Sequence, residues 1–186
     1  MTRRSTTKMT TENTLEDNPA PKQVSRKTKK PRKTTTKIKK LPSNPFMNEI
    51  LELASEQKTH AKKVAVLQEY ECIALKSLFI WNFDESVISL LPQGAVPYKP
   101  NENPLGTDHS SLRREQKNLY MFIKGGNDSL STIRRETIFI QLLEGLHPKE
   151  ADIVIAVKDK ALEDLYDIDF DVVEEAYPDI QWGNRS

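Results

Sequence analysis

The sequence predicts a mainly α-helical protein, with a single compact helical domain of about five to seven helices behind a disordered basic N-terminal arm. Three observations lead to this prediction. Apolar residues recur at helical spacing through much of the chain after residue 44. Capping residues, prolines and glycines divide that part into helix-length segments. The preceding residues hold too few bulky apolar side chains to offset the entropy of an ordered backbone. We therefore divide the chain into an arm, residues 1–43, and a body, residues 44–186.

Opposite charges distinguish the two ends of the chain. Residues 1–45 carry 13 Lys or Arg and three acids, a balance of +10. The chain totals of 28 basic and 27 acidic residues leave 15 and 24 for residues 46–186, a balance of −9. The formal net charge of +1 is therefore a cancellation. Such asymmetry predicts an anionic partner for the arm.

The first half of the body is expected to form three helices. Asn44 is a suitable N-cap for a first helix over residues 45–54. Residues 59–80 carry two apolar stripes, which predict one long helix buried against several neighbours. Asp84 is expected to cap a short helix over residues 85–91.

The second half begins with residues 92–108, which contain four prolines and two glycines and predict a long irregular loop. Four further helices are expected, over residues 110–124, 131–144, 148–166 and 170–176. The β-branched residues 153–155 make a strand the alternative there, but the flanking segments favour a helix.

The arm is expected to bind nucleic acid. Residues 22–40 hold ten Lys or Arg and no acid, so they can neutralise phosphates and release counterions. The arm has no aromatic residue on which a base could stack, so DNA or RNA should bind without sequence preference. The candidate phosphate contacts are Lys22, Arg26, Lys27, Lys29, Lys30, Arg32, Lys33, Lys37, Lys39 and Lys40.

Three other interpretations of the arm stay open. It can be a solvated tail that keeps the protein soluble. Residues 29–33, KKPRK, can form a nuclear-import signal. The arm can also fold back on the acidic body, where it would compete with outside anions.

Protein contacts are expected from the body. The candidate interface residues are Tyr98 and Leu105 in the long loop, and Trp182 close to the C-terminus. Core or rim packing is the default interpretation for Trp182, as it is for Trp81.

No catalytic site, cofactor or metal site is predicted, so we expect a protein that is not an enzyme. Asp167, Asp169 and Asp171 alternate as at the start of a calcium-binding EF-hand loop, but Val172 and Pro178 occupy the positions that need Gly and Glu. The three histidines lack the spacing of zinc ligands.

Cysteine and arginine residues also have ordinary structural interpretations. Cys72 is expected to lie in the middle of the long helix 59–80 and to pack in the core. Arg113-Arg114 and Arg134-Arg135 are expected to form salt bridges between neighbouring helices, with a phosphate-binding face as the alternative.

The chain is expected to be soluble and intracellular, with no membrane partner. Its apolar runs are far shorter than the roughly 20 residues that span a bilayer. The N-terminus lacks the apolar stretch of a secretory signal. A single cysteine excludes an intrachain disulfide.

Four blocks of the body occur together in a known family: FIWNFDESVISLLPQGAVPYKPNENP, LYMFIKGG, IRRETIFIQLLEGLHPKEADIVIAVKDKAL and AYPDIQWGNR. With these blocks, residues 46–185 resemble an uncharacterised family of small proteins from T4-like tailed phages, especially those of marine cyanobacteria. The resemblance implies a phage product in the host bacterial cytoplasm or in the virion, with a phage or host protein as partner. The family has no assigned activity, so no site residue carries over.

We therefore expect a non-enzymatic phage accessory protein, with a body that docks on a protein and an arm that contacts nucleic acid. The alternative is a structural or adaptor protein of the phage particle or of a host-takeover complex. In that case protein–protein contacts carry the function, and the arm is only a solvated appendage.

Overall fold

The structure is a computed structural model, which describes residues 40–104, 107 and 109–185. The described residues form eight α-helices and one 3-10 helix, without a β-strand, which confirms the mainly helical fold class. The elements are α1 (Met47–Ser55), α2 (His60–Glu69), α3 (Ile73–Phe83), α4 (Leu112–Glu115), η1 (Gln116–Phe122), α5 (Thr132–Gly145), α6 (Pro148–Lys158), α7 (Leu162–Leu165) and α8 (Phe170–Ala176).

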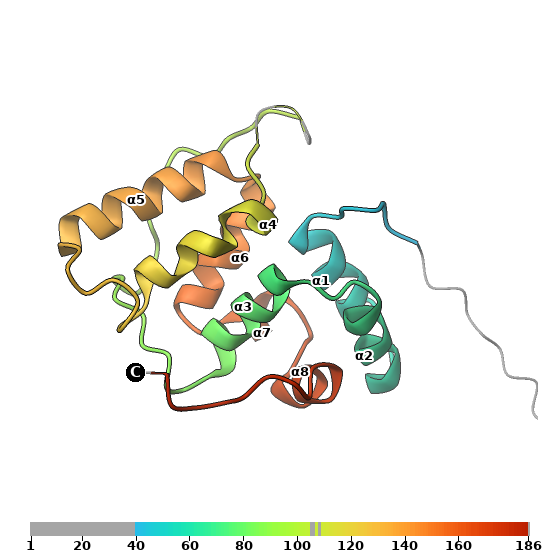
Figure 1. The fold of residues 1–186 in the computed structure, drawn as a ribbon. Coiled ribbons are helices and arrows are strands. Elements are labelled where there is room, and N and C mark those ends of the chain that lie inside the picture. Colours follow the sequence, from blue (N-terminus) through green and yellow to red (C-terminus); the bar gives the residue numbers. More distant parts are fainter. Residues whose placement is uncertain (1–39, 105–106, 108, 186) are drawn as a thin grey trace, which may run out of the picture. The chain divides into compact units, whose positions relative to one another are not determined.

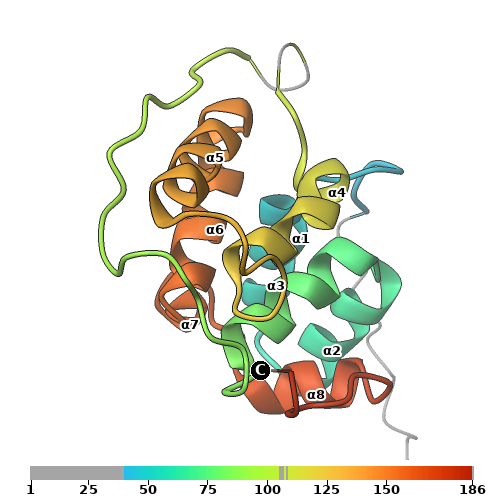
Figure 2. The ribbon, with the colours of Figure 1, turned by 60° about the vertical axis from the view of Figure 1, so that its left-hand side comes forward.

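Helices α3 and α6 form the centre of the body. Helix α3 packs on α6, α4 and η1, and α6 also packs on α1, α5 and α7. Figure 1 shows α1 and α2 on one side of α3 and α5 on the other, with α8 beside α2. Figure 2 shows the long loop after α3 passing along the outside of α5. The core between these helices consists of aliphatic and aromatic side chains from every helix.

The first helix starts later than the sequence predicts. Phe46, not Asn44, is the N-cap of α1, and its backbone N–H donates to Glu49 Oε2 at 2.9 Å. This cap from the Glu49 side chain satisfies one of the backbone donors that a helix start leaves without an intrahelical partner.

The prediction of a single helix over residues 59–80 is wrong, because the helix is interrupted between α2 and α3. Tyr70 leaves the helical conformation and Cys72 is extended, so Cys72 caps α3 instead of lying in the middle of a helix. Each of the two expected apolar stripes is divided between α2 and α3, and these two helices have different neighbours. Helix α2 packs on α1 and α8, whereas α3 packs on α6. The break therefore gives the apolar residues of α2 and α3 separate neighbours, although Ile73 at the start of α3 is 71 % exposed.

The short helix expected over residues 85–91 is also wrong. This segment pairs with the end of η1: Leu90 N–H donates to Phe122 O at 2.8 Å, and Lys124 N–H donates to Ile88 O at 2.9 Å. The pairing satisfies backbone groups that a helix would otherwise satisfy internally. The region expected as one helix, residues 110–124, is α4 followed by the tighter η1.

The second half agrees better with the expectations. Residues 92–104 have no regular secondary structure, and α5 and α8 lie where the sequence predicts them. The β-branched residues 153–155 are helical. The helix expected over residues 148–166 divides into α6 and α7, because Lys160 takes the left-handed conformation with φ 57°.

A buried carboxylate joins the starts of three helices. Glu150, in the first turn of α6, is 0 % exposed. Its Oε1 accepts from the N–H of Met47, the first residue of α1, at 2.9 Å. Its Oε2 accepts from the N–H of Leu112, the first residue of α4, at 3.0 Å. Burial raises the pKa of Glu150, although the two backbone donors and the charge of Arg113 oppose that effect.

Replacing Glu150 should therefore destabilise the whole body. The Glu150→Leu variant keeps most of the volume but leaves the N–H groups of Met47 and Leu112 without acceptors. At about 1–3 kcal/mol for each group, we expect the free energy of unfolding to fall by about 2–6 kcal/mol. Urea denaturation of the full chain measures this change. The control is Asp152→Leu, an exposed position of the same helix, and equal effects of the two substitutions would contradict the role of Glu150.

Candidate functional site

An open groove of about 800 Å³ lies where the end of α3 meets the start of α8 and the C-terminal segment. Its lining residues are Phe83, Asp84, Glu85, Ser86, Phe170, Trp182 and Gly183. We call it the Trp182 groove. Three aromatic rings and two acidic residues give it both an apolar and an anionic character.

The aromatic rings support one another as well as the groove. The rings of Phe83 and Phe170 lie with centroids 5.9 Å apart, and Trp182 meets Phe170 edge to face at 5.0 Å. Trp182 is half-buried, so its ring packs on α8 and still lines the groove. Trp81, in contrast, is a core residue that is 3 % exposed and stacks on Phe122. Of the two tryptophans, only Trp182 is therefore placed to meet a partner.

The acidic floor of the groove holds the C-terminal segment in place. Asp84 Oδ1 accepts from the N–H and the hydroxyl of Ser86, at 2.9 and 2.7 Å. Its Oδ2 accepts from Gly183 N–H and from Arg185 Nη1, both at 3.0 Å. Asp84, expected from the sequence to cap a helix over residues 85–91, is instead the anchor of residues 183–185.

These hydrogen bonds decide the charge of Asp84. Burial alone would raise the pKa of its carboxyl, but the hydrogen bonds from Ser86 and Gly183 and the charge of Arg185 outweigh it, so the pKa lies below the ordinary value. Asp84 is thus a fixed anion whose oxygens are occupied. The charge that is free to meet a ligand belongs to Glu85, which lines the groove and is exposed. Two further exposed acids, Asp169 and Asp171, are the neighbours of Phe170 in the chain.

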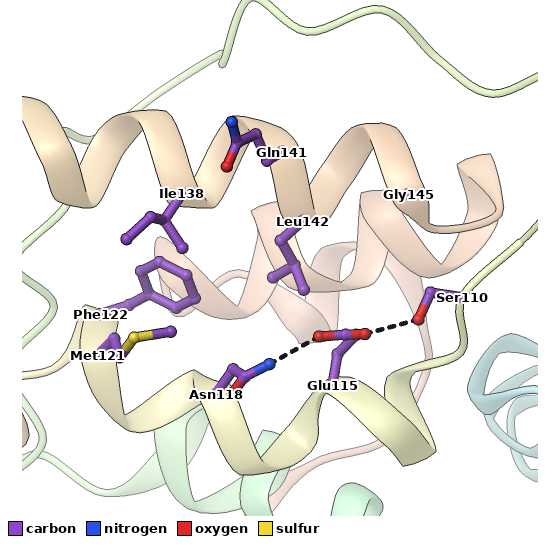
Figure 3. A pocket seen from close by; sticks show the side chains of 9 residues that line it. All are labelled: Ser110, Glu115, Asn118, Met121, Phe122, Ile138, Gln141, Leu142 and Gly145. Atoms are coloured by element: carbon purple, nitrogen blue, oxygen red, sulfur yellow. Dashed lines mark hydrogen bonds between the residues drawn. The ribbon is translucent and has the colours of Figure 1, made fainter.

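A second, narrower pocket lies between η1 and α5 and has a volume of about 220 Å³ (Figure 3). Ser110, Glu115 and Asn118 form its polar end, and Gln141 and Gly145 complete the lining. Ile138 and Leu142 extend from α5 toward Phe122 and Met121, which form an apolar wall. We call it the Glu115 pocket.

Of the other two expected interface residues, Tyr98 lies away from the Trp182 groove and Leu105 is not described. Tyr98 is partly buried against the core, where burial and then the charge of Asp152 raise its pKa. Tyr98 does not line the Trp182 groove. Its loop is fixed at one end by buried Lys158, whose Nζ donates to Pro92 O at 2.8 Å and Gly94 O at 3.1 Å. Leu105 lies outside the described residues.

Nine of the ten expected phosphate contacts also lie outside the described residues. The exception is Lys40, which is the first described residue and is exposed. All ten phosphate contacts, Lys40 included, therefore stay predictions from the sequence.

The remaining candidates of the sequence analysis have ordinary partners. Cys72 Sγ lies 3.9 Å from Met47 Sδ at the edge of the core. His147 caps α6 and accepts from Lys149 N–H. Arg113 donates to Pro45 O, and buried Arg135 donates to the backbone oxygens of Met121 and Asn127, so these two arginines bind carbonyls instead of the expected carboxylates.

The described residues contain no group of three or more His, Cys, Asp or Glu side chains placed to hold a metal ion. Within the same ranges, no helix combines the length and the apolar character needed to cross a bilayer.

Removing the Asp84 carboxylate should release the C-terminal segment. In Asp84→Asn an NH₂ group replaces one of the two acceptor oxygens, and the side chain loses its charge. The hydrogen bonds from Gly183 and Arg185 are then weakened or lost, and each charge-assisted bond contributes about 1.5–3 kcal/mol. We expect amide hydrogen exchange at Gly183 and Arg185 to accelerate at least about tenfold. The control is Glu85→Gln, and unchanged exchange in Asp84→Asn would contradict the anchoring role.

The same anchor should respond to acid. Because the folded-state pKa of Asp84 lies below its ordinary value of 3.8, its stabilising effect is present above that value and is lost as the pH falls through the folded-state pKa. We expect the amide chemical shift of Gly183, followed by NMR, to titrate with a midpoint below 3.8. A midpoint at or above that value would contradict the assignment.

Comparison with known proteins places the chain in a family without giving it an activity. Neither the curated proteins nor the solved structures contain a match. A protein-family model described as a family of unknown function, DUF6433, matches residues 50–164. That range includes α2 to α6 and the whole Glu115 pocket, but it stops before Phe170 and Trp182 of the groove. Since the match covers more than half of the chain, this protein belongs to the DUF6433 family of unknown function.

Proposed function

We propose that this protein is a non-enzymatic phage accessory protein, whose body docks on a protein partner while its arm holds nucleic acid through the phosphate backbone. The observation that carries the proposal is the charge division, with +10 on residues 1–45 and −9 on the remainder. Two parts of opposite charge attract different partners, so one chain can connect them. The phage origin rests on the four sequence blocks described above, and it implies the host cytoplasm or the virion as the location.

The composition of the arm supports backbone contacts in particular. Lys and Arg separated by Thr and Pro can follow a polyphosphate chain, whereas reading bases requires groups that hydrogen-bond or stack in fixed positions. Both DNA and RNA satisfy this chemistry.

The Trp182 groove supports protein docking by the body. A half-exposed Trp beside two other aromatic rings is a surface of the kind that anchors protein interfaces. Exposed Glu85 in its lining favours a partner segment that carries basic side chains.

The surroundings of the perturbed carboxylates support a role outside catalysis. Glu150 binds two backbone donors, and Asp84 binds four donors from Ser86 and the C-terminal segment. Each group is occupied in holding helices or segments together, so neither is free to exchange a proton with a substrate.

The salt dependence of binding tests the arm. If about six of the ten Lys and Arg of residues 22–40 contact duplex DNA, the logarithm of the binding constant should fall against the logarithm of salt concentration with a slope near −5. A full-length variant with Gln at all ten positions should lose at least about tenfold in affinity and most of this slope. Fluorescence anisotropy with duplexes of unrelated sequence measures both quantities.

The matched control replaces exposed cations of the body instead, namely Lys58, Lys99, Lys117 and Lys124 with Gln. It should keep the slope of the unmodified protein. If the control and the arm variant lose affinity equally, or if the arm variant keeps its slope, the arm is not the contact.

The Trp182 groove also favours a second candidate function, a structural or adaptor protein that acts through protein contacts alone. In that case, capture from infected cells should recover a stoichiometric protein that nuclease treatment does not release. If neither Trp182→Ala nor the groove variant Glu85→Lys captures this partner, the contact lies at the groove. If both variants still capture it, the groove is not the interface.

A further inference from the structure

The Glu115 pocket combines a carboxylate with an apolar wall, an arrangement that suits a cation on an aliphatic stem. Ser110 Oγ donates to Glu115 Oε1 at 2.7 Å, and Asn118 Nδ2 donates to Oε2 at 2.8 Å (Figure 3). The two donors hold the carboxylate in one orientation at the end of the pocket. The walls beside it come from Met121, Phe122, Ile138 and Leu142.

The carboxylate keeps room for a further partner. An ionised carboxylate offers about four acceptor positions, and Ser110 and Asn118 fill two of them. None of the ion pairs within the described residues includes Glu115. The pocket therefore presents a fixed negative charge with acceptor positions still open and with no cation from the described chain beside it.

The chemistry of the lining selects the ligand. An anion would be repelled by Glu115, and a purely apolar group would leave the two open acceptor positions of the carboxylate unfilled in a partly enclosed site. A guanidinium or ammonium group can bind the oxygens while its methylene chain lies on the Met, Phe, Ile and Leu side chains.

The charge of the body favours a protein as the source of this cation. Residues 46–186 carry a balance of −9, so a basic protein surface is attracted to the body.

We propose that the Glu115 pocket receives an Arg or Lys side chain of the protein on which the body docks. The proposal rests on the docking part of the proposed function and assigns a second contact to it, separate from the Trp182 groove. The guanidinium of Arg is favoured over the ammonium of Lys, because its planar fork can bind both carboxylate oxygens at once.

Blocked amino acids test the pocket directly. N-acetyl-arginine amide presents the side chain on a peptide-like backbone, and N-acetyl-citrulline amide is its uncharged counterpart of the same shape. We expect the arginine probe, in NMR titrations of the full chain, to shift the amide signals of Asn118 and Ile138 saturably. The citrulline probe should bind at least about tenfold more weakly, because it lacks the charge-assisted hydrogen bonds.

Two variants assign this binding to the pocket. Glu115→Gln removes the charge and should weaken binding of the arginine probe at least about tenfold. Gly145→Leu leaves the charge in place but adds a side chain at the pocket lining, and a Cβ at Gly145 meets no atom within 4 Å, so the fold should tolerate it. The Gly145→Leu variant should weaken binding of the probe, because the leucine side chain obstructs the pocket. The control is Glu163→Gln, an exposed acid of α7 outside the pocket, which should leave binding unchanged.

Three results would overturn the proposal: equal binding of the citrulline probe, unchanged binding in both Glu115→Gln and Gly145→Leu, or binding of putrescine without binding of the arginine probe. The last result would make the pocket a site for free diamines. If the Glu115→Gln variant still captures the protein partner normally, the pocket is not the contact, but the docking function stands. If the probe binds and no partner is captured, the docking function is wrong.

Discussion

The contact on which the fold depends most is the pair of hydrogen bonds accepted by Glu150. Helices α1, α4 and α6 all begin around this one carboxylate, where their free N–H groups and the positive ends of their dipoles favour a negative charge. Because no part of Glu150 is exposed, water cannot replace it as the acceptor. Helix α6 in turn packs on α1, α3, α5 and α7, so the position of one side chain fixes the relation between most of the core helices.

The opposite end of α3 is held in a comparable way, and the candidate interface depends on it. Asn82 Oδ1 accepts from Leu162 N–H at 3.1 Å, and Lys160 Nζ donates to Asp84 O at 2.8 Å, which ties α7 to the end of α3. Asp84 then holds the C-terminal segment against the same end. The Trp182 groove is therefore a surface of anchored elements, and its shape exists before a partner arrives. Such preorganisation lowers the entropy lost on binding.

The sequence predicts the fold class and the positions of α1, α5 and α8, because capping residues and apolar spacing are local signals. It fails where distant residues decide. The break at Tyr70 has no Pro or Gly to mark it, and the hydroxyl of Tyr70 accepts from Leu41 N–H, 29 residues away. Residues 85–91 have a helix-like start at Asp84, but pairing with the end of η1 satisfies their backbone instead. Trp182 is an interface candidate from the sequence alone. Glu115 and Glu150 are not, since nothing in the local sequence separates these acids from surface acids.

The distance along the chain between the partners of Glu150 has a consequence for synthesis. Met47 and Glu150 are 103 residues apart, so α1 emerges from the ribosome long before its anchor exists. At about 5–20 residues per second, the delay is about 5–20 s. During that time the apolar residues of α3 have no α6 to cover them. The nascent chain is thus a natural client for chaperones that shield apolar segments, and rapid, abundant expression would expose it to aggregation before the second half is made.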